Sequence, residues 1–207
     1  MRAVSSSCGI VAVILAAGTS RRLGRPKQSL QLGGETLLER AVRVATEASL
    51  LPVIVVVAEE NDLSEKLQQR GCRIVLNEQA EEGMAASIRC GIEVAQTLQA
   101  AGAVLMTCDQ VAVRPEHLCK LYALPASVTG SRYAGKVGIP AYFPVASFTA
   151  LMELRGDVGA REMLTGARAV HAEGLGIDID TAEDFAKAQE LFEHDARQRA
   201  RRARPKS

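Results

Sequence analysis

The chain reads Ile10-Val11-Ala12-Val13-Ile14-Leu15-Ala16-Ala17-Gly18-Thr19-Ser20-Arg21-Arg22-Leu23-Gly24-Arg25-Pro26-Lys27 near its N-terminus, and this stretch decides the fold. Residues 10–15 are aliphatic without a break, which predicts a short buried strand. The small residues that follow let the backbone come close to a ligand and leave N–H groups pointing outward. The arginines and the lysine beyond them are suited to neutralise phosphates. A strand that ends in such a loop predicts a cradle for a nucleoside triphosphate.

Other interpretations of this stretch fit less well. A secretory signal is disfavoured because the apolar run is at the short end for one and Arg21-Arg22 follow it at once. The run is also far too short to span a bilayer. Gly18 and Gly24 enclose five residues and Arg25 follows them, so the loop is not a Walker A motif, and the dinucleotide fingerprint G-x-G-x-x-G is absent. A solvated basic turn remains as an alternative.

The composition is that of one soluble globular domain. Of the 207 residues, 47% are hydrophobic and 24% are charged. A net charge of +1 gives no reason to expect binding to nucleic acid or to membranes. The 5 cysteines are odd in number and form no C-x-x-C pair, which indicates the reduced thiols of a cytoplasmic protein.

Helices and strands alternate after the first loop. Thr36 and Glu39 have the spacing of a capping box, and apolar residues at helical spacing continue from there to Ala48. Further strands are predicted over residues 53–57, 72–76 and 103–108, and further helices over residues 60–70 and 84–98 and from about Pro115. Strands that are apolar throughout and alternate with helices predict an α/β fold with a mostly parallel central sheet, covered on both faces.

The pattern weakens from about residue 125 onward. It predicts short strands near residues 126–130 and 137–143, helices near residues 145–154 and 158–165, and a last helix that begins near Thr181. No linker divides the chain, so we expect a single domain over residues 1–193. Residues 194–207 are rich in arginine and contain nothing apolar except alanine, which predicts a disordered tail.

Several polar residues follow the predicted strands. Ligands of an open parallel sheet bind at the carboxyl ends of its strands, which is where Asn77 and Asp109 stand. Gly83 opens a predicted helix whose N-terminus could meet a phosphate or a base. Asp109 is a candidate metal ligand, and Asp180 offers a second carboxylate. Each of these residues could also be a turn residue or a helix cap.

Taken together, the segments resemble a known family. The stretch Leu15-Ala16-Ala17-Gly18-x-Ser20-x-Arg22-x-Gly24-x-Pro26-Lys27 closely resembles the signature loop of nucleotidylyltransferases of the molybdenum-cofactor type. Four further segments fit in the same order, namely Asn77-x5-Gly83-Met84-x2-Ser87-Ile88-x2-Gly91, Asp109-Gln110, Gly156-Asp157-Val158-Gly159-Ala160-Arg161 and Asp178-Ile179-Asp180-Thr181-x-Glu183-Asp184. The third of these four segments, Gly156–Arg161, looks like the molybdopterin cytidylyltransferases and their relatives linked to xanthine dehydrogenase maturation.

The resemblance implies a three-layer, Rossmann-like fold of the nucleotide-diphospho-sugar transferase type. It implies transfer of CMP from CTP to the terminal phosphate of molybdopterin, with release of pyrophosphate and with Mg²⁺ as the metal ion. The implied nucleotide-binding residues are Leu15, Ala16, Ala17, Gly18, Arg22, Lys27, Asn77, Gly83 and Ser87. The implied catalytic residues are Lys27 and Arg22, and the implied metal ligands are Asp109 and Asp180. Asp157 and Arg161 lie well after the nucleotide half of the chain, so we expect them to bind the acceptor.

Two positions depart from the family's pattern. Val111 stands where proline usually follows Asp-Gln, and Ile139 stands where a histidine often precedes the proline of the substrate-side strand. The second departure concerns the acceptor. Ala16-Ala17 stands where the guanylyl branch tends to have Ala-Gly, so the resemblance favours CTP over GTP. The alternatives are GTP as the donor, a sugar or alcohol phosphate as the acceptor, or a non-catalytic carrier that delivers molybdenum cofactor to a hydroxylase.

Overall fold

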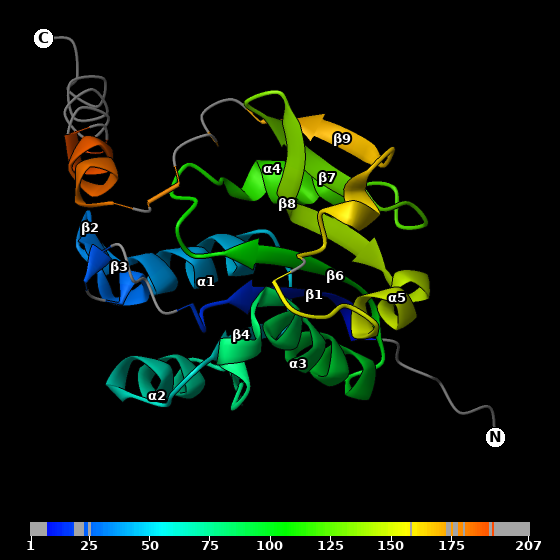
Figure 1. The fold of residues 1–207 in the computed structure, drawn as a ribbon, viewed down its shortest axis with the longest axis horizontal. Coiled ribbons are helices and arrows are strands. Elements are labelled where there is room, and N and C mark those ends of the chain that lie inside the picture. Colours follow the sequence, from blue (N-terminus) through cyan, green and yellow to red (C-terminus); the bar gives the residue numbers. More distant parts are fainter. Residues whose placement is uncertain are drawn as a thin grey trace, which may run out of the picture.

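A computed structural model of the chain describes residues 8–18, 23–24, 26–157, 159–172, 175, 178–179, 181–190 and 192. Its centre is a seven-stranded sheet with the strand order β5-β4-β1-β6-β8-β7-β9 (Figure 1). The strands are β1 (Cys8–Leu15), β4 (Val53–Val57), β5 (Arg73–Leu76), β6 (Ala100–Thr107), β7 (Thr129–Tyr133), β8 (Lys136–Pro144) and β9 (Arg168–His171). Only β8 runs against its neighbours in this sheet. The predicted mostly parallel α/β sheet is therefore confirmed.

The central strands are buried on both faces, which is why their sequences are apolar throughout. Along β1, Ala12 and Ile14 face one core cluster, whereas Val11 and Val13 face the other. All four side chains are fully buried. The sheet is thus the middle layer of three.

Helices form the two outer layers. The first cluster includes buried residues of α1 (Leu37–Glu47), α2 (Asp62–Gln69) and α4 (Pro115–Leu121). The second includes buried residues of α3 (Met84–Thr97) and α5 (Phe148–Met152). In Figure 1, α3 and α5 lie side by side beneath the sheet.

The start of α1 follows the sequence prediction. The Thr36 hydroxyl accepts a hydrogen bond from the Glu39 backbone N–H, and the Glu39 carboxylate accepts one from the Thr36 backbone N–H, which completes the capping box. A hairpin of two very short strands, β2 (Gln31–Leu32) and β3 (Glu35–Thr36), precedes the helix. This hairpin was not predicted from the sequence.

The second half of the chain corrects several predictions. The strand expected near residues 126–130 is β7, which begins three residues later, at Thr129. The helix expected near residues 145–154 is a 3-10 turn, Val145–Ser147, followed by the short helix α5. The helix expected near residues 158–165 is wrong, because the described part of that segment holds only the 3-10 turn Glu162–Leu164. The edge strand β9 was not predicted.

The last described helix covers residues 182–190. Thr181 and Asp184 cap it, since the Thr181 backbone N–H donates to the Asp184 carboxylate and the Asp184 backbone N–H donates to the Thr181 hydroxyl. The single domain over residues 1–193 stays a prediction, and the tail 194–207 lies outside the described residues. Within the described chain, no helix has the length and apolarity needed to cross a bilayer.

Candidate functional site

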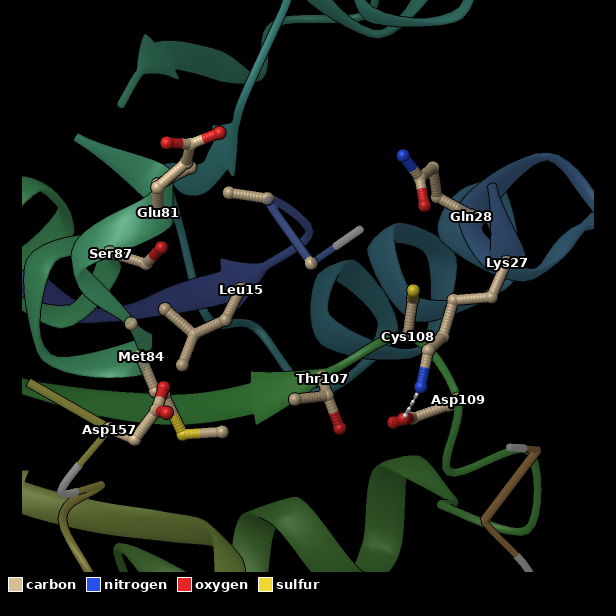
Figure 2. A pocket seen from close by; sticks show the side chains of 14 residues that line it. Leu15, Lys27, Gln28, Glu81, Met84, Ser87, Thr107, Cys108, Asp109 and Asp157 are labelled. Atoms are coloured by element: carbon tan, nitrogen blue, oxygen red, sulfur yellow. Dashed lines mark hydrogen bonds and ion pairs between the residues drawn. The ribbon is translucent and has the colours of Figure 1, made fainter. Parts of the chain in front are cut away.

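A pocket of about 470 Å³ opens at the carboxyl ends of β1 and β6 (Figure 2). This is the edge of an open parallel sheet where ligands bind. The lining residues come from the loop after β1, the turn before α3, the end of β6 and the loop after α5. They are Leu15, Ala17, Gly18, Lys27, Gln28, Ala80, Glu81, Gly83, Met84, Ser87, Thr107, Cys108, Asp109 and Asp157.

The loop after β1 forms one wall of the pocket. Leu15, Ala17 and Gly18 line it, whereas Ala16 is 4% exposed and does not. The Ala16 backbone N–H donates to the Val56 carbonyl over 2.8 Å, which ties the loop to the end of β4. The described start of the predicted nucleotide-binding loop therefore lines the pocket, and its backbone is held in place at Ala16. Arg22 lies outside the described residues.

Lys27 and Asp109 meet in the pocket. Lys27 begins a 3-10 turn, Lys27–Ser29, and Asp109 follows β6. The Lys27 ammonium donates a hydrogen bond to the Asp109 carboxylate over 2.6 Å, and the two side chains are only 18% and 15% exposed. Sequence reasoning assigned Lys27 to phosphate and Asp109 to metal, but it did not foresee that they form an ion pair with each other.

The turn after Asp109 is held by several backbone hydrogen bonds. The Asp109 carbonyl accepts from the Val111 N–H over 3.1 Å and from the Ile179 N–H over 3.3 Å. Gln110 forms an isolated bridge with Asp178, so residues 178–179 lie against residues 109–110. Val111 therefore provides a hydrogen bond that proline, which lacks an N–H, could not make. Asp180 lies outside the described residues.

The start of α3 contributes Gly83 and Ser87. Asn77 does not line the pocket, since it is 2% exposed and its amide donates to the Ser87 hydroxyl over 2.9 Å. The Asn77 carboxamide oxygen accepts from the Gln79 backbone N–H. Asn77 thus orients Ser87 from behind, and the Ser87 oxygen is already used as an acceptor on that side.

Asp157 and Arg161 were both predicted to bind the acceptor, but they lie in different surroundings. Asp157 lines the same pocket as Leu15, Gly83 and Ser87. Arg161 is exposed and close to Tyr133. Burial raises the pKa of the Tyr133 hydroxyl, and the negative charge of Asp178 adds to this, whereas Arg161 opposes it.

Tyr133 and Gln110 form a network beside Asp109. The Gln110 amide nitrogen donates to the Tyr133 hydroxyl and to the Ile139 carbonyl, and the Tyr133 hydroxyl donates to the same carbonyl. The Gln110 carboxamide oxygen is buried and has no hydrogen-bond partner in the described part of the chain. Sequence reasoning missed Tyr133 and treated Gln110 only as part of a motif, because nothing local in the sequence links Gln110, in the turn after β6, to Tyr133 in β7.

The pocket contains further residues that sequence reasoning did not select. Gln28 follows Lys27 directly, and Thr107-Cys108 immediately precede Asp109, so their position beside predicted residues was a usable signal. Burial raises the pKa of the Cys108 thiol to about 12, so this cysteine is a neutral wall residue at ordinary pH. Among the described residues, no group of three or more histidine, cysteine, aspartate or glutamate side chains could hold a metal ion.

Comparison with known proteins agrees with this geometry. The family model described as "MobA-like NTP transferase domain" matches residues 12–172. The purine catabolism protein PucB of Bacillus subtilis is 33% identical, and the alignment covers 85% of this chain and 94% of PucB. A probable molybdenum cofactor guanylyltransferase of Opitutus terrae is 31% identical over 53% of this chain and 52% of its own length.

Solved structures give the same result. The crystal structure of Rv0371c from Mycobacterium tuberculosis H37Rv is 32% identical, has a TM-score of 0.75, and covers 87% of this chain and 97% of its own. Fold and pocket define the class of protein as a nucleotidyltransferase. More specifically, the chain belongs to the MobA-like NTP transferase family.

Proposed function

We propose that this nucleotidyltransferase transfers CMP from CTP to the terminal phosphate of molybdopterin and releases pyrophosphate, with Mg²⁺ as the metal ion. The observation that carries the proposal is the contact of Lys27 with Asp109 in the pocket at the end of β6. A cation and a strand-end carboxylate at one point suit a reaction in which two phosphate groups must approach each other. The resemblance of the Gly156–Arg161 segment and the family membership support molybdopterin as the acceptor.

In the proposed reaction, an oxygen of the acceptor phosphate attacks the α-phosphorus of CTP. The new oxygen–phosphorus bond forms as the bond between the α-phosphorus and the bridging oxygen breaks, and pyrophosphate leaves with the electron pair. The attacking phosphate is already ionised, so the chain needs no general base. Lys27 would stabilise negative charge on the α-phosphate and on the leaving group, and Arg22 would assist it.

Asp109 fits a magnesium ligand. Mg²⁺ is usually bound by one or two carboxylates together with substrate phosphates, so a cage of three protein side chains is not required. The metal would neutralise phosphate charge as a Lewis acid. The structure of Rv0371c in complex with manganese, 28% identical with a TM-score of 0.67, supports a divalent metal in this family. The proposed second ligand is Asp180, which follows Ile179, the residue whose backbone N–H donates to the Asp109 carbonyl.

The nucleotide would be held by the backbone of Leu15, Ala17 and Gly18 and by Ser87, whose oxygen accepts from Asn77. The Ser87 hydroxyl proton is then available for an acceptor atom of the ligand. The choice of CTP rests on Ala16-Ala17. The acceptor would lie on the side of Arg161 and Tyr133, where a guanidinium can pair with its phosphate.

The setting of the reaction is part of the proposal. The cysteines whose side chains are described, Cys72, Cys90, Cys108 and Cys119, are free thiols, which suits the cytoplasm. A molybdenum hydroxylase would receive the product.

The test is to incubate the protein with Mg²⁺, molybdenum cofactor and each of CTP, GTP, ATP and UTP, and to identify any dinucleotide by mass. We expect the wild-type protein to form the cytosine dinucleotide together with pyrophosphate. The Asp109→Asn variant should form neither product. Formation of a guanine dinucleotide would show that the donor is GTP and not CTP. Turnover with a sugar phosphate but not with molybdenum cofactor would show that the proposed acceptor is wrong. Tight cofactor binding without pyrophosphate release would favour the carrier.

A further inference from the structure

The two ends of the pocket differ in charge. Figure 2 shows Lys27 and Asp109 at one end, and Met84, Asp157 and Ser87 at the other. Glu81 also lines the pocket, on the side of Ser87. Among the described lining residues, Lys27 is the one cation. A triphosphate would be attracted by Lys27 and repelled by Glu81 and Asp157, so we expect the uncharged base at the Asp157 end.

The loop that carries Asp157 is fastened to the start of α3. The Arg89 guanidinium donates to the Leu154 carbonyl over 2.6 Å and to the Glu82 carboxylate over 2.7 Å. The Ala85 N–H donates to the Gly156 carbonyl over 3.1 Å, and the Glu82 carboxylate accepts from the Gly156 backbone. These contacts hold Asp157 beside the base end before any ligand binds, which is what a selective contact needs.

Gly83 makes this close approach possible. A Cβ atom at Gly83 would collide with the Asp157 carboxylate and would lie 2.7 Å from the Gly156 carbonyl group. The φ angle of Gly83 is +117°, which side chains other than glycine rarely adopt. The Asp157 carboxylate therefore lies directly against the backbone at the start of α3.

We infer that Asp157 accepts a hydrogen bond from the exocyclic amino group of the nucleotide base and so selects CTP over UTP. The Asp157 carboxylate lines the pocket and makes no hydrogen bond or ion pair with any residue that the structure describes. An ionised carboxylate is an acceptor only. The N4 amino group of cytosine donates to it, whereas the O4 carbonyl of uracil would meet it acceptor to acceptor. This inference rests on the proposed function, and it assigns Asp157 to the nucleotide base instead of to the acceptor, where the sequence analysis expects it.

The test is calorimetric titration of CTP and of UTP, with Mg²⁺ and without any acceptor, into the wild-type protein and two variants. Asp157→Asn keeps the shape of the side chain, and its amide can donate to the uracil carbonyl. Glu81→Gln removes the same charge from the same end of the pocket and is the matched control. We expect wild-type protein to prefer CTP by about 100-fold or more, and Asp157→Asn to reduce this preference at least about tenfold. Glu81→Gln should change both affinities together and leave their ratio intact.

The inference would be overturned if Asp157→Asn left the ratio of CTP to UTP affinity unchanged. It would also be overturned if Glu81→Gln reduced that ratio as much as Asp157→Asn does. In a separate steady-state transfer assay, an Asp157→Asn variant whose sole defect is a raised KM for the acceptor would also overturn it. Because the titration contains no acceptor, its result does not depend on whether the protein transfers CMP to molybdopterin. Equally, an unchanged ratio of CTP to UTP affinity would not contradict the proposed transfer reaction.

Discussion

Replacing Lys27 with methionine should strengthen metal binding at Asp109 while it slows nucleotidyl transfer. Lys27 and Asp109 are 2.6 Å apart, and both side chains are more than four-fifths buried. In the absence of nucleotide, a metal ion must compete with the Lys27 ammonium for the Asp109 carboxylate. In its presence, the phosphates offer Lys27 other partners.

The geometry sets the size of both effects. A hydrogen bond between charged groups contributes about 1.5–3 kcal/mol net. Since about 1.4 kcal/mol corresponds to a factor of ten in affinity, removal of Lys27 should tighten metal binding to the nucleotide-free protein roughly 10- to 100-fold. Loss of one preorganised positive donor to the reacting phosphates should lower the transfer rate by about 10²–10³-fold.

The assay is titration of Mn²⁺ followed by electron paramagnetic resonance, on wild-type protein and Lys27→Met without nucleotide, together with single-turnover transfer. Lys120→Met, which removes an exposed lysine of α4, is the control and should change neither quantity. Weaker or equal Mn²⁺ binding by Lys27→Met would refute the competition between lysine and metal. An unchanged transfer rate would remove Lys27 from catalysis.

Two further predictions concern the stability of the fold. Gly91→Ala should lower the free energy of unfolding by about 1–3 kcal/mol, because a Cβ there would collide with the Val13 side chain of β1; in urea unfolding, the exposed substitution Gln96→Ala on the same helix should be nearly neutral, and equal effects would contradict the close packing of α3 on β1. Glu39→Gln should destabilise the protein at pH 7 but not near pH 2. The Lys66 ammonium and the Thr36 backbone hold the pKa of Glu39 at about 2 in the folded protein, so this stabilisation is present above pH 4.5 and is lost as the pH falls toward 2. Unfolding of both proteins across that range measures the difference, and a difference independent of pH would show that the ionised form of Glu39 is not what stabilises the fold.

The central sheet was predictable because a strand that is buried on both faces has an uninterrupted run of apolar residues in the sequence. β4 is Val-Ile-Val-Val-Val, and every one of its residues is buried. β9 has no such apolar run, since it is an edge strand of four residues, none of which is fully buried. The segment near residues 158–165 misled the prediction because Ala160 and Leu164 are buried at helical spacing. There the chain makes a 3-10 turn and leaves through Gly166, whose φ angle is +74°.

The positions of Lys27 in the loop region after β1 and of Asp109 just after β6 were also predictable, but their contact was not. It joins residues 82 positions apart and depends on β1 and β6 being neighbours in the sheet. The same holds for Asp157 and Gly83, which meet because the loop after α5 returns to the start of α3. Sequence order suggested that Asp157 belongs with the acceptor, whereas its place in the pocket is beside the nucleotide-side residues.

The most direct test of the proposed reaction follows the phosphorus atoms of CTP. The protein is incubated with Mg²⁺, molybdenum cofactor and CTP labelled at either the α- or the γ-phosphorus. If CMP is transferred, the α label appears in a cofactor dinucleotide and the γ label appears in pyrophosphate, in equal amounts. Retention of both labels in CTP while the cofactor is bound, or release of the γ label as inorganic phosphate, would contradict nucleotidyl transfer to molybdenum cofactor.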